Sequence, residues 1–546
     1  MRRLCGAAGI IAAVNLVHGS SAWAQQATGE KPAVQADAGA APAADDGQPQ
    51  RLIDIMNYRI EGNSVLDRRS VERAVLPYLG PQRSTGDVEL ARAALEKAYR
   101  DAGYETVAVE IPEQEVRKGI VRLNVTELRV GRLRVTNARW YSPEDIKDRA
   151  PSLAEGSVPN YKAVAQEIAA LNKSQERTIT PALRAGDTPG TVDVDLDVDD
   201  RMPFHGSLEI NDRTSARTKR LRASASVRYA NLFQRDHSLS LQGQFAPEDP
   251  GQSWVVSGSY VAPIAGTPFT LVAYGVHSNS DVAAIGGINV LGSGDIAGIR
   301  GIYNFQSSDT LFHTITLGAD YKSFGENLLL GDNTAKTPID YIPLTLQYAL
   351  AQRTKNTDLD FNVSLNFGLR GLDADDIEFQ LKRSGASASY AYLRADFDYL
   401  WRLPHDFRFN LKLAGQISGQ PLISNEQFGA GGLDSVRGYY ESQELGDDGY
   451  SFQVDAISPS LLGDTKGRHE LRLFAFVDGA LVRVNEPLDP STASASLMSV
   501  GGGINARFFN RFNASGLLAV PLRRRSTTLI DFNNNVRAQF RVWADF

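Results

Sequence analysis

The sequence predicts a transmembrane β-barrel of about sixteen antiparallel strands, preceded by two small α+β units. The chain has 546 residues and a mean hydropathy of −0.26, and beyond the N-terminus no run reaches the roughly 18 apolar residues that a membrane helix needs. From residue 204 to the end, apolar and polar side chains alternate instead. The 48 glycines, 19 tyrosines and 23 phenylalanines are also typical of barrel strands.

Residues 1–24 are predicted to be a secretory signal peptide. Two arginines follow the initiator methionine, an apolar run extends from Leu4 to Val17, and an Ala-x-Ala cleavage site ends at Ala24. A short anchoring helix is the alternative, but the run is too short to span a bilayer and no stop-transfer pattern follows. Because Cys5 is the sole cysteine, we expect a mature chain without disulfides or thiol chemistry.

Residues 25–51 are predicted to be a disordered linker, because they are rich in Ala, Gln, Asp, Gly and Pro and almost lack large apolar side chains. Without the signal, the chain carries 55 basic and 64 acidic residues, a net charge of −9. That balance argues against nucleic acid as a general partner.

Two copies of one small α+β unit are predicted next, at 52–127 and 128–201. Each has the order strand, helix, helix, strand, strand. In the first copy the elements are 53–61, a helix containing Val71 and Val75, a helix capped by Asp87, and strands 106–111 and 119–126. In the second copy they are 128–135, 143–147, a helix with its apolar face between Tyr161 and Leu171, and strands 178–184 and 191–199.

The remainder, 202–546, is predicted to be the barrel. Phe361, Val363 and Leu365 would face one way while Asn362 and Ser364 face the other. A soluble sandwich also alternates, but strands of about ten residues sustained over this length fit a lipid-facing barrel better.

Sixteen candidate strands divide this region. They lie near 204–211, 219–229, 237–246, 253–262, 268–278, 295–306, 311–322, 338–351, 357–370, 387–402, 406–418, 450–460, 468–481, 495–508, 511–521 and 534–546. Connections after odd strands tend to be long (279–294, 323–337, 371–386, 419–449), whereas 307–310 and 403–405 are tight. Short periplasmic turns and long outer loops are typical of outer-membrane barrels, and an even strand count places both chain ends of the barrel in the periplasm.

One loop carries a specific family resemblance. The segment from Phe428 to Tyr439, FGAGGLDSVRGY, falls between the eleventh and twelfth strands, and its core is Val436, Arg437, Gly438 and Tyr439. It closely resembles the conserved loop of two-partner secretion transporters, the haemolysin and filamentous haemagglutinin secretion-activation family. The likeness continues from residue 52 to the end, with 111–121 resembling the close of that family's first polypeptide-transport-associated (POTRA) domain and 229–233 its early barrel segment.

A second family motif, F-x-D-x-G on the thirteenth strand, is matched by Phe476 and Asp478, but Gly479 is followed by Ala480 where the motif has its final glycine. The local backbone geometry is therefore open. Alternation along 471–478 independently places Asp478 on the lumen side. The family's N-terminal plug helix is not evident, because 25–50 has no amphipathic stripe.

The resemblance implies that Asp478 is the partner of Arg437. A guanidinium at the tip of a loop inside a lumen is partly desolvated, and a bidentate carboxylate pair would hold the loop in place. A solvated loop arginine is the alternative that the residues alone would favour.

The resemblance also implies a function: an outer-membrane pore, with its POTRA domains in the periplasm, that binds an unfolded partner and exports it. The partner would be a large β-helical exoprotein that adds to exposed sheet edges of the POTRA-like units as a strand. The units could instead only pack on the barrel mouth. The competing functions are an outer-membrane protein insertase of the related assembly superfamily and a passive porin. Two POTRA-like units favour the transporter over the insertase. A porin is disfavoured because it needs no client-binding arm.

Other patterns give weaker signals. The alternating aspartates from Asp193 to Asp199 could suggest calcium, but side chains on one strand face point in parallel, which favours a solvated sheet face. The run Arg523 to Arg525 could meet lipopolysaccharide phosphates or be a solvated charge run. The histidines are scattered, so we predict no metal site, no cofactor and no enzymatic activity.

The last residue, Phe546, ends an alternating strand on the side predicted to face lipid. An aromatic C-terminus of this kind resembles the signal by which the barrel assembly machinery recognises its substrates. We therefore expect contact with that machinery and with outer-membrane lipid.

Overall fold

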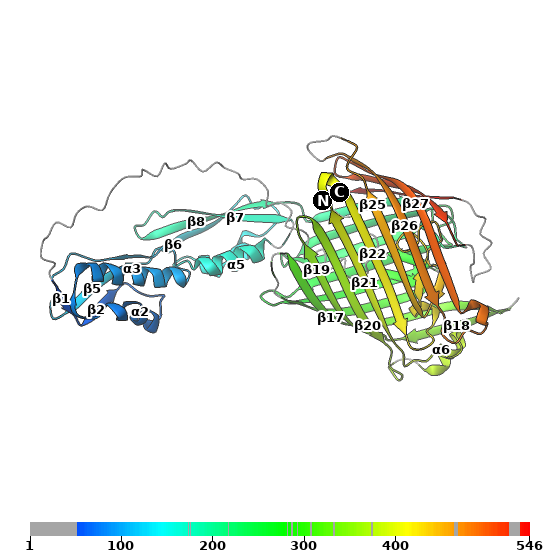
Figure 1. The fold of residues 1–546 in the computed structure, drawn as a ribbon, viewed down its shortest axis with the longest axis horizontal. Coiled ribbons are helices and arrows are strands. Elements are labelled where there is room, and N and C mark those ends of the chain that lie inside the picture. The colour runs from blue at the N-terminus through cyan, green and yellow to red at the C-terminus, as the bar shows by residue number, and fades with distance from the viewer. Residues whose placement is uncertain are drawn as a thin grey trace. The chain divides into compact units, whose positions relative to one another are not determined.

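The computed structural model describes 52–172, 174, 176–216, 218–280, 293–305, 308, 310–325, 337–372, 375–462, 468–523 and 536–546 with side chains. It adds the backbone of 282–285, 288–291, 326–330 and 333–336. The predicted signal peptide, the predicted linker, Arg524 and Arg525 lie outside the described residues. The described chain forms two compact units that divide between Met202 and Pro203 (Figure 1).

The first repeat, 52–127, is a three-stranded sheet covered by two helices. Its elements are β1 (Ile53–Ile55), β2 (Asn57–Glu61), α2 (Arg68–Val75), η1 (Leu76–Tyr78), β3 (Gly80–Arg83), α3 (Thr85–Asp101), β4 (Ala108–Glu110) and β5 (Ile120–Thr126). The sheet order is β2-β5-β4, with β2 parallel to β5. Leu95, Tyr99 and Leu123 are fully buried between helices and sheet. The pairing of β1 with β3 was not predicted.

The start of α3 differs from the predicted one. Ser84, not Asp87, is the N-cap, and the two side chains form a capping box. The Ser84 hydroxyl accepts from the Asp87 amide at 3.2 Å, and the Asp87 carboxylate accepts from the Ser84 amide at 2.8 Å. The hydrogen bonds that the Ser84 amide and hydroxyl donate to the Asp87 carboxylate lower the pKa of Asp87. An acidic residue three positions after a serine is the pattern that indicates this cap, and it places the N-cap three residues earlier than predicted.

The second repeat, 128–201, has the same topology. Its elements are β6 (Arg129–Thr136), α4 (Pro143–Asp148), η2 (Pro151–Leu153), α5 (Tyr161–Leu171), β7 (Arg177–Ala185) and β8 (Thr191–Asp200). The sheet order is β6-β8-β7, with β6 parallel to β8. In both repeats the last strand lies in the middle of the sheet. It pairs antiparallel with the strand before it and parallel with the first strand of the sheet, as an internal repeat requires.

The second unit is a closed antiparallel barrel of sixteen strands, as predicted. Its strands are β9 (Phe204–Asn211), β10 (Arg222–Leu232), β11 (His237–Phe245), β12 (Trp254–Pro263), β13 (Phe269–Asn279), β16 (Gly294–Phe305), β17 (Leu311–Leu330), β18 (Asn333–Tyr341) with β19 (Leu344–Arg353), β20 (Thr357–Phe367), β21 (Ala391–Arg402), β22 (Arg408–Ser418), β25 (Asp448–Ile457), β26 (Glu470–Arg483), β27 (Ser494–Phe508), β28 (Phe512–Pro521) and β29 (Arg537–Asp545).

β18 and β19 together make one strand, because both pair with β17. The interruption lies at Pro343, which has no N–H to give to the ladder. Five residue pairs between β29 and β9 close the barrel. The predicted loop 323–337 is wrong in extent, since β17 and β18 continue their pairing as far as Leu330 and Asn333.

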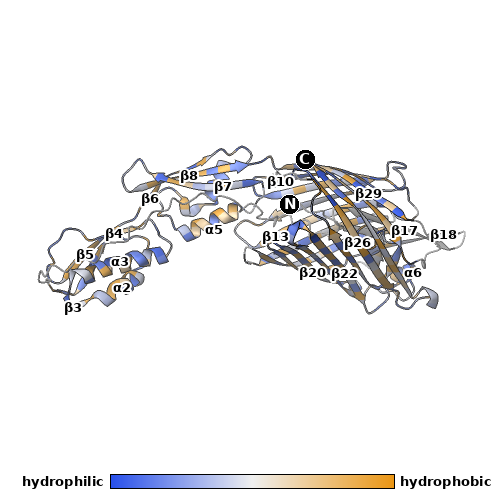
Figure 2. Cartoon of the chain, turned by 45° about the horizontal axis from the view of Figure 1, so that its top comes forward, coloured by the Kyte–Doolittle hydropathy of each residue, from blue (hydrophilic) through white to orange (hydrophobic). Residues whose placement is uncertain are grey.

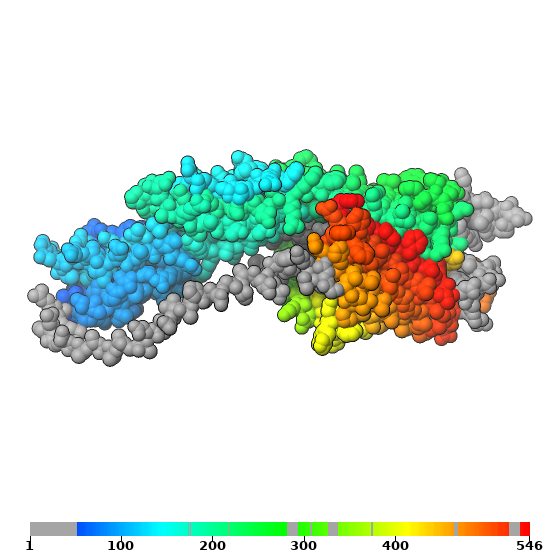
Figure 3. Space-filling model, turned by 90° about the horizontal axis from the view of Figure 1, so that it is seen from above, coloured from blue at the N-terminus to red at the C-terminus, as the bar shows by residue number. Residues whose placement is uncertain are grey.

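The wall has an apolar outer face and a mixed inner face. Leu365, Leu413 and Leu473 are exposed on the outside, whereas Asn362 and Gln416 are buried on the inside. Hydrophobic colour therefore recurs along β20, β22 and β26 (Figure 2). Side chains of the C-terminal strands, orange to red, form a continuous surface (Figure 3). Among the described residues no helix is long and apolar enough to cross a membrane.

Most long connections follow odd strands and carry small elements of their own. They hold the hairpin β14 (Val282–Ile285) and β15 (Ile288–Leu291), helix α6 (Asp376–Lys382), η4 (Ser424–Glu426), the hairpin β23 (Phe428–Ala430) and β24 (Glu444–Gly446), and η5 (Pro490–Thr492). The turn with η3 (Pro404–Asp406) follows an even strand. We name the connections by strand order: loop 1 (212–221), loop 9 (368–390), loop 11 (419–447) and loop 13 (484–493).

Candidate functional site in the barrel lumen

Loop 11 folds back against the inner wall of the barrel. Its hairpin β23–β24 packs on β26, and Phe428, Val436 and Tyr439 form a buried cluster with the inward-facing Ala480 and Val482. The loop therefore rests on the same wall that carries the second sequence motif.

Arg437 and Asp478 form the predicted bidentate pair. The Nε and Nη2 atoms of Arg437 lie 2.8 and 2.7 Å from the two oxygens of Asp478, and the backbone amide of Arg437 donates to the same carboxylate at 3.0 Å. Arg437 is 7% exposed and Asp478 is 0% exposed. Three charge-assisted hydrogen bonds in a dry site fix both the side chain and the backbone of the loop tip.

Two further groups surround the guanidinium. Asp455 on β25 places Oδ1 2.7 Å from Nη2, and the ring of Phe476 lies 3.8 Å from Cζ. Phe476 thus makes a cation–π contact with Arg437 from two positions before Asp478. Sequence reasoning missed Asp455, although strand register could have found it, because Asp455 lies directly opposite Phe476.

Val436, Gly438 and Tyr439 anchor the loop around Arg437. Val436 is fully buried. Gly438 has φ +93°, and a Cβ there would lie 2.9 Å from the Ala519 Cβ, so this position requires glycine. Its amide donates to Gln539 at 3.0 Å. The Tyr439 hydroxyl lies 2.8 Å from the carbonyl oxygen of Arg523, which ties the loop to the end of β28.

The departure from the second motif does not disturb the strand. Ala480 pairs in register with Ser451 and Leu497, without a bulge. Its methyl group is buried under the loop beside Val436. Gly479 faces outward, where a Cβ would approach the ring of Phe452 to 2.6 Å.

A second group of ion pairs holds loop 11 from beyond the β29–β9 pairing that closes the barrel. Arg213 in loop 1 contacts Asp434, and its Nε lies 3.3 Å from Oε1 of Glu441. The Thr214 carbonyl accepts from the Glu441 amide at 3.0 Å. Nothing in the sequence indicated this contact, since the partners are more than 200 residues apart.

Aspartates of β8 bind neighbouring strands of the sheet and the segment before α4. Asp195 is buried and receives Arg134 at 2.8 Å and Arg184 at 3.1 Å. The Asp200 carboxylate accepts from the backbone amides of 139–141. Within the described residues, no group of three His, Cys, Asp or Glu side chains could hold a metal ion.

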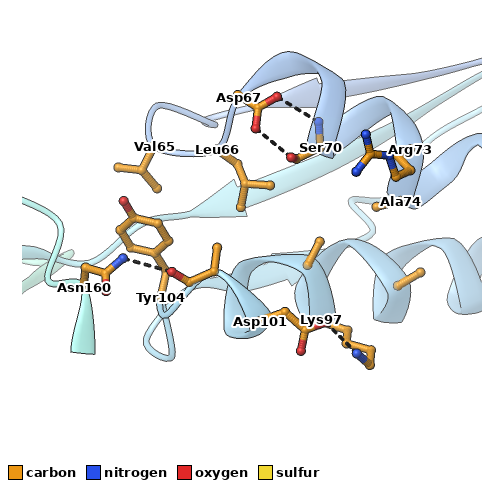
Figure 4. Close-up of a pocket in the computed structure, with 13 residues that line it drawn as sticks. Val65, Leu66, Asp67, Ser70, Arg73, Ala74, Lys97, Asp101, Tyr104 and Asn160 are labelled. Carbon is orange, nitrogen blue, oxygen red and sulfur yellow. Dashed lines mark hydrogen bonds and ion pairs between the residues drawn. The ribbon is translucent and has the colours of Figure 1, made fainter. Parts of the chain in front are cut away.

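A groove of about 580 Å³ runs between α2 and α3 of the first repeat (Figure 4). Its floor is made of small side chains such as Ala74 and Ala98. Rim groups bond to one another: Asp67 accepts from Ser70, and Lys97 donates to Asp101.

Phe546 lies on the outer face of the closing strand and is 58% exposed. Its amide donates to Gly206 at 2.8 Å. We predict that removing Phe546 lowers the amount of inserted barrel, because its exposed aromatic ring would then be lost as the expected recognition signal. Heat-modifiable mobility of outer-membrane fractions measures this, with Phe546→Tyr as the control that keeps an aromatic ring; unchanged insertion after deletion would contradict the prediction.

Comparison with known proteins follows the same division of the chain. The haemolysin secretion/activation protein family ShlB/FhaC/HecB matches residues 190–506, and the ShlB-type POTRA domain matches 53–127. The outer membrane transporter CdiB of Dickeya dadantii (strain 3937) is 23% identical over 391 residues, 66% of this chain. That alignment spans 63% of the length of CdiB, just under two thirds.

Solved structures show the same fold. CdiB from Escherichia coli superposes with a TM-score of 0.61 at 16% identity, over 93% of both chains. CdiB from Acinetobacter baumannii gives 0.55 at 16% identity over 91% of both. BamA from Haemophilus ducreyi lacking POTRA domains 1–3 gives 0.55 at 15% identity, covering 91% of this chain and all of that one. Because the family model covers more than half of the chain, and confirms the resemblance carried by the VRGY loop, this chain belongs to the haemolysin secretion/activation protein family ShlB/FhaC/HecB.

Proposed function

We propose that this chain exports one unfolded exoprotein through the barrel lumen to the cell surface, after the periplasmic POTRA repeats have bound it. The barrel lies in the bacterial outer membrane and the repeats in the periplasm. The observation that carries the proposal is loop 11, held inside the lumen by the buried pair of Arg437 and Asp478. A loop fixed by a small set of side-chain contacts can be displaced as one body when a client enters. No enzymatic step is part of this function.

Client capture is proposed to occur by strand addition, and the structure limits where it can occur. On β7 the Gly186 amide donates to Thr191 on the β8 side, so alternation turns the backbone of Ile179 and Pro181 to the outer edge. Both polar groups of Ile179 are bonded to the Asn172 side chain, at 2.7 and 2.9 Å. Pro181 has no N–H. This edge therefore cannot accept a continuous strand.

The outer edge of β6 is occupied by the chain that precedes α5. The Val130 amide donates to Ser157 at 2.8 Å, and the Val130 carbonyl accepts from Gly156 at 2.7 Å. The Leu133 amide donates to the Glu155 carboxylate at 3.1 Å. Among the described residues, neither edge of the second repeat therefore offers an uninterrupted run of free backbone groups.

In the first repeat, one edge is capped in the same way. Arg92 donates to the Val109 carbonyl on the outer edge of β4 at 3.2 Å. Beyond β4, the side chain of Gln114 bonds both backbone groups of Arg122 on β5. Its Oε1 accepts from the Arg122 N–H at 2.7 Å, and its Nε2 donates to the Arg122 carbonyl at 2.8 Å.

The outer edge of β2 remains. The Asn57 amide donates to Gly119 on the β5 side at 3.2 Å, so the backbone of Tyr58 and Ile60 points outward. Among the described residues, no side chain or loop bonds these outward groups. We therefore assign client strand addition to β2, because a backbone edge binds an extended chain without requiring a folded partner.

The test compares culture supernatants of cells with and without this gene. We expect the loss of one large protein from the supernatant, which identifies the exoprotein. If several barrel proteins disappear from the outer membrane instead, the chain is an insertase and the proposal is wrong.

Insertion of the barrel is proposed to use the barrel assembly machinery through the C-terminal strand. The outer loops would face lipopolysaccharide, and the apolar outer face the lipid chains. Direction of transport would come from client folding outside, since the sequence contains no GxxxxGK[ST] nucleotide-binding motif.

A further inference from the structure

A buried carboxylate joins three of the long loops. Asp447, at the end of loop 11, is 0% exposed. It accepts from the Leu422 amide at 2.9 Å, from the Gln427 side chain at 3.1 Å and from the Asn485 amide in loop 13 at 2.7 Å. These donors satisfy the carboxylate from two loops.

The third loop supplies the counter-charge. Arg383 in loop 9 makes a two-pronged contact with Asp447, in which Nη2 lies 2.7 Å from Oδ2. The same guanidinium donates to the Leu422 carbonyl at 2.5 Å and to the Asn485 carbonyl at 2.8 Å. One side chain thus bridges loops 9, 11 and 13, which are three successive connections between the six adjacent strands from β20 to β27.

Loop 9 and the start of loop 11 also share a closed aromatic cluster. Glu426 of loop 11 is 2% exposed and accepts from Lys322 on β17 and Tyr341 on β18, both at 2.6 Å, and from Tyr392 on β21 at 2.7 Å. Phe379 of α6 is buried against the Tyr341 ring, with centroids 5.6 Å apart. The contacts fasten loop 9 and loop 11 to the wall on the side away from β26.

All of these loops lie at one end of the barrel. They follow odd strands, whereas the periplasmic unit joins the start of β9, the first strand. In an antiparallel barrel the ends of odd strands lie opposite that start, so the loops lie at the outer end.

We propose that Arg383 and Asp447 form a clasp that closes the outer end of the barrel, and that its release is a step separate from release of the Arg437–Asp478 pair. This inference rests on the proposed pore, and it adds a second lock with no residue in common with the first. The lumen pair holds the tip of loop 11 on β26, while the clasp holds the base of loop 11 to loops 9 and 13.

The clasp variant is expected to fold. Arg383→Ala removes the counter-charge but leaves Asp447 with the Leu422, Gln427 and Asn485 donors, so the carboxylate keeps hydrogen-bond partners. Arg370→Ala is the matched control, because Arg370 lies in the same loop and its ion pair with Asp376, at 2.9 Å, has the arginine side chain 66% exposed.

The experiment records single-channel currents of the purified full-length protein in planar bilayers, and vancomycin sensitivity of cells that contain equal amounts of heat-modifiable barrel. Arg383→Ala should raise the frequency of open events and the sensitivity by about fivefold or more, with Arg370→Ala at the wild-type level. Asp447→Asn keeps the shape of the side chain and should also raise both readouts. Equal behaviour of Arg383→Ala and Arg370→Ala would overturn the clasp.

A double variant, Arg383→Ala with Arg437→Ala, tests whether the locks are separate. Independent locks give a fold-change in open frequency equal to the product of the single effects, whereas a double variant no more open than either single variant shows one shared step. No exoprotein is needed, so failure of the clasp prediction leaves the proposed export function untouched. If the clasp variants behave as expected but no secreted protein depends on this gene, only the proposed function is rejected.

Discussion

Replacing Arg437 with alanine is expected to reduce export of the exoprotein by about tenfold or more while the barrel still assembles. The change leaves Asp478 buried with only the backbone amide of residue 437 as a charge-stabilising donor, and it removes the ion-pair partner of Asp455. Breaking one side of a buried pair costs roughly 3–5 kcal/mol, enough to release the loop tip from β26. Export is measured as exoprotein in the supernatant, normalised to heat-modifiable barrel in the outer membrane.

Two variants separate a positioning role from general damage. Arg437→Lys keeps the charge but cannot make the fork contact or cover the Phe476 ring as well, so it should recover only part of the export. Asp478→Asn should resemble Arg437→Ala. Normal export by Arg437→Ala at wild-type barrel levels would remove the lumen pair from the mechanism.

A proline at position 60 is expected to lower export by about tenfold. Because the Ile60 N–H points to the open edge of β2, Ile60→Pro removes a donor that an incoming strand needs while leaving the β2–β5 ladder intact. The pore itself is unchanged. The measurement is again exoprotein in the supernatant, with accumulation of the client in the periplasm as the second readout.

The matched control is Leu183→Pro on β7. Leu183 also turns its backbone to an outer edge and is 45% exposed, but that edge is already blocked by Asn172 and Pro181. Export should remain at the wild-type level in this variant. If both prolines reduce export equally, or if neither does, strand addition at β2 is wrong.

The sequence predicted most of the architecture because lipid and water impose periodic patterns. Alternation along 361–365 or 471–478 has a period of two, and only one face of such a strand can meet lipid, so strand number and the inward direction of Asp478 could be read directly. The internal repeat was visible for a similar reason, because each small sheet must bury one face under helices. Boundaries were less certain: β17 and β18 continue through a stretch rich in Gly, Asn and Thr that reads as a loop.

The site was predicted only in part. Arg437 and Asp478 were found through motifs, yet Asp455, Arg213 and Asp447 were not, since each acts through partners distant in sequence. A lone acidic or basic residue carries no pattern that identifies its partner. Strand register would have placed Asp455, whereas nothing local indicates which loops meet at Asp447.

By itself, the sequence of this protein determined the barrel, the two repeats and the residues at the tip of loop 11, because repeating side-chain patterns and a contiguous motif are properties of the linear chain. The tertiary structure alone decided which strand edges are capped, that Phe476 and Asp455 complete the surroundings of Arg437, and that loops 9, 11 and 13 converge on one buried carboxylate. Those features depend on closure of the barrel and on the folding of each repeat, which bring together groups up to hundreds of residues apart.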